Sequence, residues 1–164
     1  MRVVLQRVSS GSVVVDGAEG GSIGTGYVIL LGIKHGDDAS DAVFLADKCS
    51  ALRVFEDTRG KMNLNLQDVG GGVLIVSQFT LYADAQKGNR PGFSRAAPAQ
   101  EAKPLYELFV SRMRRNIGEE RVRTGVFGAM MQVHIVNDGP VTIVIESLQT
   151  PPLRGGGTHE NNPQ

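Results

Sequence analysis

The sequence predicts a single layered domain that mixes strands and helices, a mixed fold of the α/β or α+β class. Three observations lead to this prediction: five or more short apolar runs with strand character, two longer stretches with helical apolar spacing, and a length of 164 residues of which 41% are apolar. A chain of this size can bury a substantial core within one domain. Strands and helices in one chain usually pack as layers around such a core.

The first strands are expected near the amino terminus. Residues 3–5 and 13–15 are apolar and favour two strands, with a turn at Asp16-Gly17 after the second. Residues 27–33 (YVILLGI) form a continuous apolar run. Such a run indicates a strand that is buried on both faces.

Two stretches have the apolar spacing of amphipathic helices. Asp37 or Asp38 can cap the first, whose apolar stripe consists of Ala42, Leu45, Ala46, Cys49 and Leu52. The second is expected over residues 100–117, with Pro104 early enough to lie in or near the first turn. Its stripe consists of Leu105, Leu108, Phe109, Met113 and Ile117.

Further strands are expected at residues 53–55 and 73–79, and a last pair at 132–136 and 141–145. The last two flank the cluster Asn137-Asp138-Gly139-Pro140-Val141-Thr142. Turns of such residues are common, so spacing alone favours an ordinary hairpin. Proline removes a backbone donor and glycine tolerates unusual backbone angles, so the cluster could instead point its carbonyls outward.

Charge restricts the partners. The formal net charge is zero, so no general field draws the chain onto nucleic acid, and any RNA contact must be local. We expect no DNA partner. Two basic stretches could supply a local RNA contact: Lys87, Arg90 and Arg95 in a loop that contains Gly and Pro, and Arg112, Arg114, Arg115, Arg121 and Arg123 around a helix end.

Cysteine content and hydropathy indicate the compartment. Cys49 is the single cysteine and lies in a helical apolar pattern, which favours a buried core thiol in a reducing cytoplasm. No apolar run approaches the roughly 18 residues that span a bilayer. The amino terminus alternates like a strand, unlike a signal segment. We therefore expect a cytoplasmic protein with no membrane partner.

Conventional catalytic groups do not assemble in the sequence. His159 lies near the end of the chain, His134 alternates with apolar residues on an expected strand, and His35 follows a strand at a loop. There is no Gly-x-Ser-x-Gly, no His-Glu-x-x-His and no Cys/His cluster. A catalytic triad or a zinc site is therefore not expected, and neither is a cofactor. Gly20-Gly21 and the glycines at 70–72 lack the lysine and spacing of a phosphate loop, so we interpret them as turns.

Two short motifs carry a more specific signal. One is Ser77-Gln78-Phe79-Thr80-Leu81, directly after an apolar strand, and the other is Asn-x-Gly-Pro-x-Thr at residues 137–142. In this order and at this separation they resemble the paired signatures of D-aminoacyl-tRNA deacylases of the bacterial and eukaryotic type. The resemblance covers about residues 1–147 and includes residues 1–8, 26–33, 87–93 and 125–133. One departure is Met130, where relatives often have an acidic or polar residue.

The resemblance implies a fold and an activity. The fold would be a single-domain layered β/β/α sandwich over residues 1–148, with a mixed sheet and two main helices. The activity would be hydrolysis of the ester bond of D-aminoacyl-tRNA, and of glycine mischarged on alanine tRNA. The enzyme would be a homodimer with tRNA as its substrate, and it would spare L-aminoacyl-tRNA.

The resemblance also implies roles for individual residues. Ser77, Gln78, Phe79 and Thr80 would form the catalytic segment, with backbone N–H groups near 78–80 that stabilise an oxyanion. The 2′-OH of the terminal ribose would supply the reactive group that the protein lacks. A cis turn from the partner subunit would reject L-amino acids, and Arg7 would hold that turn. The implied substrate-binding set is Gly139, Pro140, Met131, Arg7, Asn137 and Thr142.

Other interpretations remain open. The amides at 78–80 could simply continue a sheet, Thr80 could act as a nucleophile, and Arg7 could be a surface residue. The whole protein could be a noncatalytic tRNA-binding protein of the same fold, which the intact motifs argue against. It could also be a small-molecule esterase, which the lack of a nucleophile–base pair argues against. Residues 149–164 have too few apolar side chains to repay ordering, so we expect a disordered tail.

Overall fold

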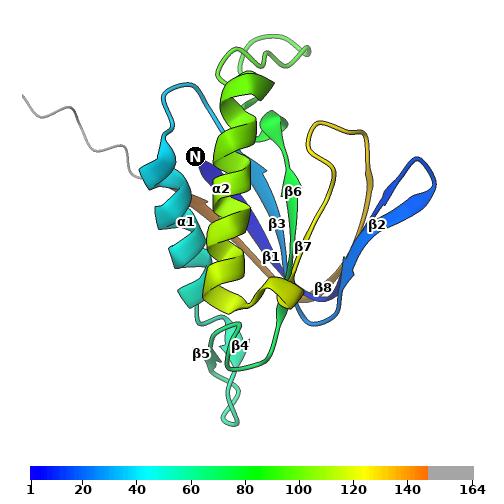
Figure 1. The fold of residues 1–164 in the computed structure, drawn as a ribbon, viewed down its shortest axis with the longest axis vertical. Coiled ribbons are helices and arrows are strands. Elements are labelled where there is room, and N and C mark those ends of the chain that lie inside the picture. Colours follow the sequence, from blue (N-terminus) through cyan, green and yellow to red (C-terminus); the bar gives the residue numbers. More distant parts are fainter. Residues whose placement is uncertain (148–164) are drawn as a thin grey trace, which may run out of the picture.

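A computed structural model describes residues 1–147, so the tail expected at 149–164 lies outside the described residues. Helices α1 and α2 lie together over one face of a twisted sheet, and the hairpin that contains β2 projects from the opposite side (Figure 1). The mixed α/β class is thereby confirmed. In chain order the elements are β1 (Arg2–Val15), β2 (Ala18–Ile23), β3 (Gly26–Gly32), α1 (Ala39–Ala51), β4 (Phe55–Glu56), β5 (Met62–Leu64), β6 (Gly72–Ser77), η1 (Phe79–Tyr82), α2 (Ala99–Ile117), η2 (Glu119–Arg121), β7 (Val122–Thr124) and β8 (Gln132–Glu146).

The main sheet is mixed. Its strand order is β2-β1-β3-β6-β7, and β8 pairs with β1 as well. The pairs β3–β6 and β6–β7 are parallel, whereas β1 is antiparallel to all three of its partners. The strand expected at 53–55 is instead β4, which pairs with β5 in a separate two-stranded sheet.

Apolar residues on the two faces of the sheet form two cores. On β6, Val73 and Ile75 belong to the large core under the helices, whereas Leu74 and Val76 belong to a smaller core on the opposite face. This alternation follows from the two-residue period of a strand. It explains why both central strands, β3 and β6, are apolar throughout, and it produces the β/β/α layering.

The two end strands differ from the prediction. Residues 3–5 and 13–15 belong to one continuous strand, β1, and residues 132–136 and 141–145 belong to one strand, β8. The expected hairpin at 137–142 is therefore wrong, because both halves of β8 pair with β1. Val8 lies opposite Asn137 and Gln6 lies opposite Thr142, so β8 advances five residues where β1 advances two. The Gly-Pro cluster is an extended bulge in β8.

The side chains of β8 face one core before the bulge and the other core after it. Val133 and Ile135, before the bulge, pack against the smaller core, while Ile143 and Ile145, after it, pack against the core under the helices. An odd number of extra residues switches the side-chain alternation to the other face. Because of the bulge, a single strand contributes apolar side chains to both cores.

The helix boundaries largely follow the prediction. Asp38 caps α1 and forms a capping box with Asp41, and the expected stripe is buried apart from Leu52, which is only partly buried. Burial raises the pKa of the Cys49 thiol to about 12, as expected of a core thiol. In α2, Pro104 lies in the second turn, because the helix already begins at Ala99. No helix within residues 1–147 is long and apolar enough to cross a membrane.

Glycines account for two smaller differences. Gly20 and Gly21, expected in a turn, lie within β2. A Cβ at Gly21 would stand 3.2 Å from the Thr124 carbonyl oxygen, so the glycine permits a close approach of β2 to β7. Of the glycines at 70–72, the last begins β6.

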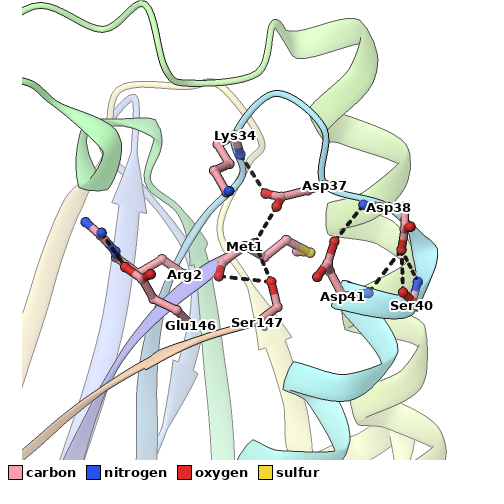
Figure 2. A network of polar contacts seen from close by, with 9 residues as sticks. All are labelled: Met1, Arg2, Lys34, Asp37, Asp38, Ser40, Asp41, Glu146 and Ser147. Atoms are coloured by element: carbon pink, nitrogen blue, oxygen red, sulfur yellow. Dashed lines mark hydrogen bonds and ion pairs between the residues drawn. The ribbon is translucent and has the colours of Figure 1, made fainter. Parts of the chain in front are cut away.

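A buried polar network joins the start of β1 and the end of β8, which lie side by side, to the loop before α1 (Figure 2). The α-ammonium group of Met1 lies 2.6 Å from Asp37 Oδ1 and donates to Ser147 Oγ at 2.6 Å. The other carboxylate oxygen of Asp37 accepts the N–H of Lys34 at 2.7 Å. Neither partner of the Met1–Asp37 ion pair has an exposed side chain. The network connects β1, β8 and the loop that follows β3.

Replacing Asp37 by alanine should strongly destabilise the fold, because an ammonium group would stay buried without its counter-charge. Breaking a buried pair from one side costs about 3–5 kcal/mol. Urea denaturation measures the loss. The matched control is Glu107→Ala, which removes an exposed ion pair to Lys103 (3.9 Å) and should cost less than about 1 kcal/mol. Equal losses in both variants would contradict a structural role for the buried pair.

Candidate active site

A cavity of about 510 Å³ opens at the carboxyl ends of β3 and β6, beside the first turn of α2. Crevices at the carboxyl ends of parallel strands are common ligand sites. The lining residues come from four parts of the chain: Leu31, Ile33, Val76, Ser77, Gln78, Phe79, Thr80, Ala97, Ala99, Ala102, Phe127, Gly128, Ala129, Met130, Met131 and Val133. Five of the expected site residues, Ser77 to Thr80 and Met131, therefore lie together.

The Ser77–Thr80 segment changes direction at the cavity. Ser77 is the last residue of β6, and the Gln78 N–H donates to the Leu31 carbonyl at 2.8 Å, so this amide continues the sheet. The chain then turns into η1, where the side chains of Phe79 and Thr80 are exposed. Within residues 1–147, no hydrogen bond takes up the N–H groups of Phe79 and Thr80. Two backbone donors are thus available at the cavity.

None of the sixteen described residues that line the cavity is ionisable. Thr80 Oγ1 accepts a hydrogen bond from Gln78 Nε2, and an amide cannot act as a general base. His35 Nδ1 lies 3.5 Å from Glu101 Oε2 outside the lining, His134 is exposed on β8, and His159 lies outside the described residues. Chemistry in this cavity therefore depends on backbone donors, hydroxyls and the substrate.

Residues 127–133 form one wall of the cavity, and of these the sequence singled out only Met131 as a site residue. Phe127 lies against Tyr106, with ring centroids 5.3 Å apart. Met131 packs directly over Gly125, since a Cβ there would meet its sulfur at 2.5 Å. Met130 is 90% exposed at the rim. The run at 125–133 was noted in the sequence, but only the fold shows that it closes the cavity.

The remaining candidate residues lie elsewhere. Gly139 and Pro140, joined by a cis peptide bond, are exposed at the bulge of β8, as are Asn137 and Thr142. None of these four, nor Arg7, lines the cavity. A single chain thus holds the two motifs apart.

Arg7 fixes the bulge to the body of the protein. Its side chain is 5% exposed, so the surface alternative is wrong. Nε donates to the Asp138 carbonyl at 3.1 Å and lies 3.0 Å from Asp138 Oδ2, while Nη1 donates to the Val54 carbonyl at 2.6 Å. Arg7 pairs with Tyr27 at the start of β3. Leu31, the first residue of β3 that lines the cavity, lies four residues beyond Tyr27, which is about 13 Å along the strand.

Comparison with known proteins gives a consistent result. A family model described as D-Tyr-tRNA(Tyr) deacylase matches residues 4–146. Proteins named D-aminoacyl-tRNA deacylase are 56% identical in Thermomicrobium roseum, over 95% of this chain and 98% of theirs, and 58% identical in Anaeromyxobacter dehalogenans, over 90% and 97%. A solved structure named c-Myc DNA Unwinding Element Binding Protein is 43% identical with a TM-score of 0.85, over 90% of this chain and 99% of that one. A probable eukaryotic D-amino acid tRNA deacylase shares the fold, with a TM-score of 0.76 at 18% identity, over 88% and 98%.

Proposed function

The chain belongs to the D-Tyr-tRNA(Tyr) deacylase family and is a hydrolase of the aminoacyl-tRNA ester bond, and we propose from this premise how its residues perform that reaction. The ester would lie in the cavity at the end of β6. The observation that carries the proposal is the combination of two uncommitted backbone N–H groups with a lining that, among residues 1–147, has no ionisable side chain.

The first role of the protein is to stabilise the oxyanion. As the ester carbonyl is attacked, negative charge develops on its oxygen. The N–H groups of Phe79 and Thr80 are fixed at the start of η1 and have no competing acceptor among the described residues. A positioned donor of this kind contributes on the order of 3 kcal/mol in well-studied hydrolases. The backbone N–H of Gln78 is excluded from this role, because it already donates a hydrogen bond to the Leu31 carbonyl.

The reactive group comes from the substrate. The 2′-OH of the terminal ribose stands next to the esterified 3′ oxygen and is therefore already positioned near the scissile carbonyl. This hydroxyl would activate or position the attacking water. This assignment accounts for a cavity in which, within the part of the chain that the structure describes, the polar side chains are those of Ser77, Gln78 and Thr80.

Selection against L-aminoacyl-tRNA requires an obstacle. The two enantiomers carry the same atoms, so favourable contacts to the side chain alone discriminate poorly. We assign the obstacle to Gly139 and Pro140, with Asn137 and Thr142 beside them. The filter acts around Cα, so it accepts many D-residues and also glycine, including glycine mischarged on alanine tRNA.

A second copy of the chain would bring the obstacle to the ester. Arg7 holds Asp138 against the body, which leaves Gly139 and Pro140 exposed, and neither residue lines the cavity of its own chain. In a two-fold dimer, each bulge enters the partner's cavity and two equivalent sites result. The proposal therefore includes a homodimer with tRNA as its substrate.

Wild-type protein and Thr80→Ala should both release the amino acid from D-aminoacyl-tRNA. The variant should retain kcat/KM within about tenfold, since it loses one neutral hydrogen bond worth about 1 kcal/mol and no nucleophile. Acid-gel or thin-layer analysis of the ester measures the rate.

Three results of this experiment would count against the proposal. Binding of the tRNA by wild-type protein without loss of the ester would indicate a noncatalytic tRNA-binding protein. Equal efficiency on a methyl ester of the same D-amino acid would indicate a small-molecule esterase. An acyl group trapped on Thr80 in the wild-type protein would establish a covalent mechanism instead.

A further inference from the structure

A loop of residues 84–95, hereafter the basic loop, presents three cations beside the cavity. Lys87, Arg90 and Arg95 are all exposed. None of them forms an ion pair with any residue in the described part of the chain. With Asp84 as its one carboxylate, the loop carries three cations and one anion, a net charge of +2 on a chain whose net charge is zero, and a local excess of positive charge favours anions.

The basic loop is fastened at the rim of the cavity. Asp84 and Gly92 exchange both backbone hydrogen bonds, each of 2.8 Å, and so close the loop on itself. The Arg95 carbonyl accepts the N–H of His35 at 3.2 Å. Two residues further on, Ala97 lines the cavity and donates to the Ile33 carbonyl at 3.0 Å. The cations are therefore held at a defined place relative to the ester site.

An exposed aromatic pair connects the loop with the catalytic segment. Phe93 of the loop (39% exposed) meets Phe79 (57% exposed) edge to face, with ring centroids 5.2 Å apart. Exposed aromatic rings beside cations are the combination that binds single-stranded nucleic acid, since bases stack on rings while cations contact phosphates.

The other basic stretch lacks this arrangement. Arg112 is bound by both oxygens of Asp47, at 2.6 and 2.8 Å, and Arg121 lies 3.7 Å from Glu120. Arg114 and Arg115 are exposed but belong to the last turn of α2. That helix is about 27 Å long and has its first turn at the cavity, with the basic loop at the same end (Figure 1).

We propose that the basic loop binds the phosphates of the single-stranded 3′ end of the tRNA, next to the terminal nucleotide whose ester occupies the cavity. This inference rests on the proposed function and extends it from the ester to the RNA strand that carries it. The cations act on binding and not on the chemical step, because none of them lines the cavity.

The test compares two double variants that each lose two exposed cations, Lys87→Gln/Arg90→Gln in the basic loop and Arg114→Gln/Arg115→Gln at the far end of α2. Each is assayed on D-aminoacyl-tRNA and on the 3′ ester of adenosine with the same D-amino acid. The basic-loop variant should raise KM for the tRNA roughly tenfold without changing kcat. Its salt dependence should become shallower by about 1.4 in log–log slope, for two lost phosphate contacts on a single strand. Its rate on the adenosine ester, and both rates of the far-end variant, should equal those of the wild type.

An unchanged KM and salt slope in the basic-loop variant would overturn the inference. Equal losses on both substrates would also overturn it, because the loop would then shape the cavity. Binding of uncharged tRNA, measured in parallel, separates this inference from the proposed function. If wild-type protein hydrolyses neither ester but the basic-loop variant alone binds tRNA about tenfold more weakly, the proposed function fails and the phosphate contact stands.

Discussion

A D-aminoacyl-tRNA should be hydrolysed at least about a thousandfold faster than the same tRNA carrying the L-enantiomer. Such a ratio corresponds to about 4 kcal/mol between the two transition states. The L-ester presents its substituents at Cα in the opposite arrangement, so the bulge at Gly139 and Pro140 would collide with it, and a collision can supply this difference where added attraction cannot.

The measurement is the loss of ester from matched D- and L-aminoacyl-tRNAs at equal protein concentration, corrected for spontaneous hydrolysis without protein. Arg7→Met provides a structural variant, because methionine occupies a similar length but cannot donate to Asp138 or Val54. With its bulge no longer held, this variant should lose much of the D/L ratio. Equal rates for both enantiomers with wild-type protein would eliminate the chiral filter.

Local patterns in the sequence predicted the parts of the fold that depend on local interactions. The cap at Asp38 and the stripe of α1 follow from neighbours three and four residues apart, and both are confirmed. The continuous apolar run at 27–33 predicted a strand buried on both faces. The structure confirms this, since β3 has an apolar core on each side. Strand β7 has only three residues, too few for a periodic signal, and so it was not predicted.

The interpretation of residues 132–146 was wrong for a different reason. Asn, Gly and Pro in succession favour a turn locally, but β1 extends along both halves of the segment and pairs with each. Long-range pairing outweighed local turn preference, and the cluster became a bulge. Nothing in the local pattern distinguishes the two outcomes, since both place apolar alternation on either side of the same four residues.

In the candidate site, too, the sequence located what is contiguous in the chain and missed what depends on distant contacts. The motif at 77–80 is contiguous, and its chain position after an apolar strand was enough to locate it at a strand end. The sequence did not separate the Gln78 amide, which is bonded in the sheet, from the amides of Phe79 and Thr80. The burial of Arg7 was also beyond sequence reasoning, because its contacts Val54 and Asp138 lie 47 and 131 residues away.

In the mechanism that we propose, the ribose of the substrate provides the reactive group that the cavity lacks. No ionisable side chain from the described residues lines the cavity, so under this proposal the protein would contribute position and backbone donors. Removing the 2′-OH should then remove chemistry without removing binding. We expect a fall in turnover of about a hundredfold or more, the lower end of what general acid–base catalysis contributes.

The most direct measurement is the single-turnover rate of ester loss from a D-aminoacyl-tRNA that ends in 2′-deoxyadenosine, compared with the same tRNA that ends in adenosine. Binding of both is measured in parallel. We expect the deoxy substrate to bind with nearly unchanged affinity and to be hydrolysed at least about a hundredfold more slowly. A deoxy substrate that is hydrolysed at close to the normal rate would contradict substrate assistance, and the base would then have to be a group of the protein.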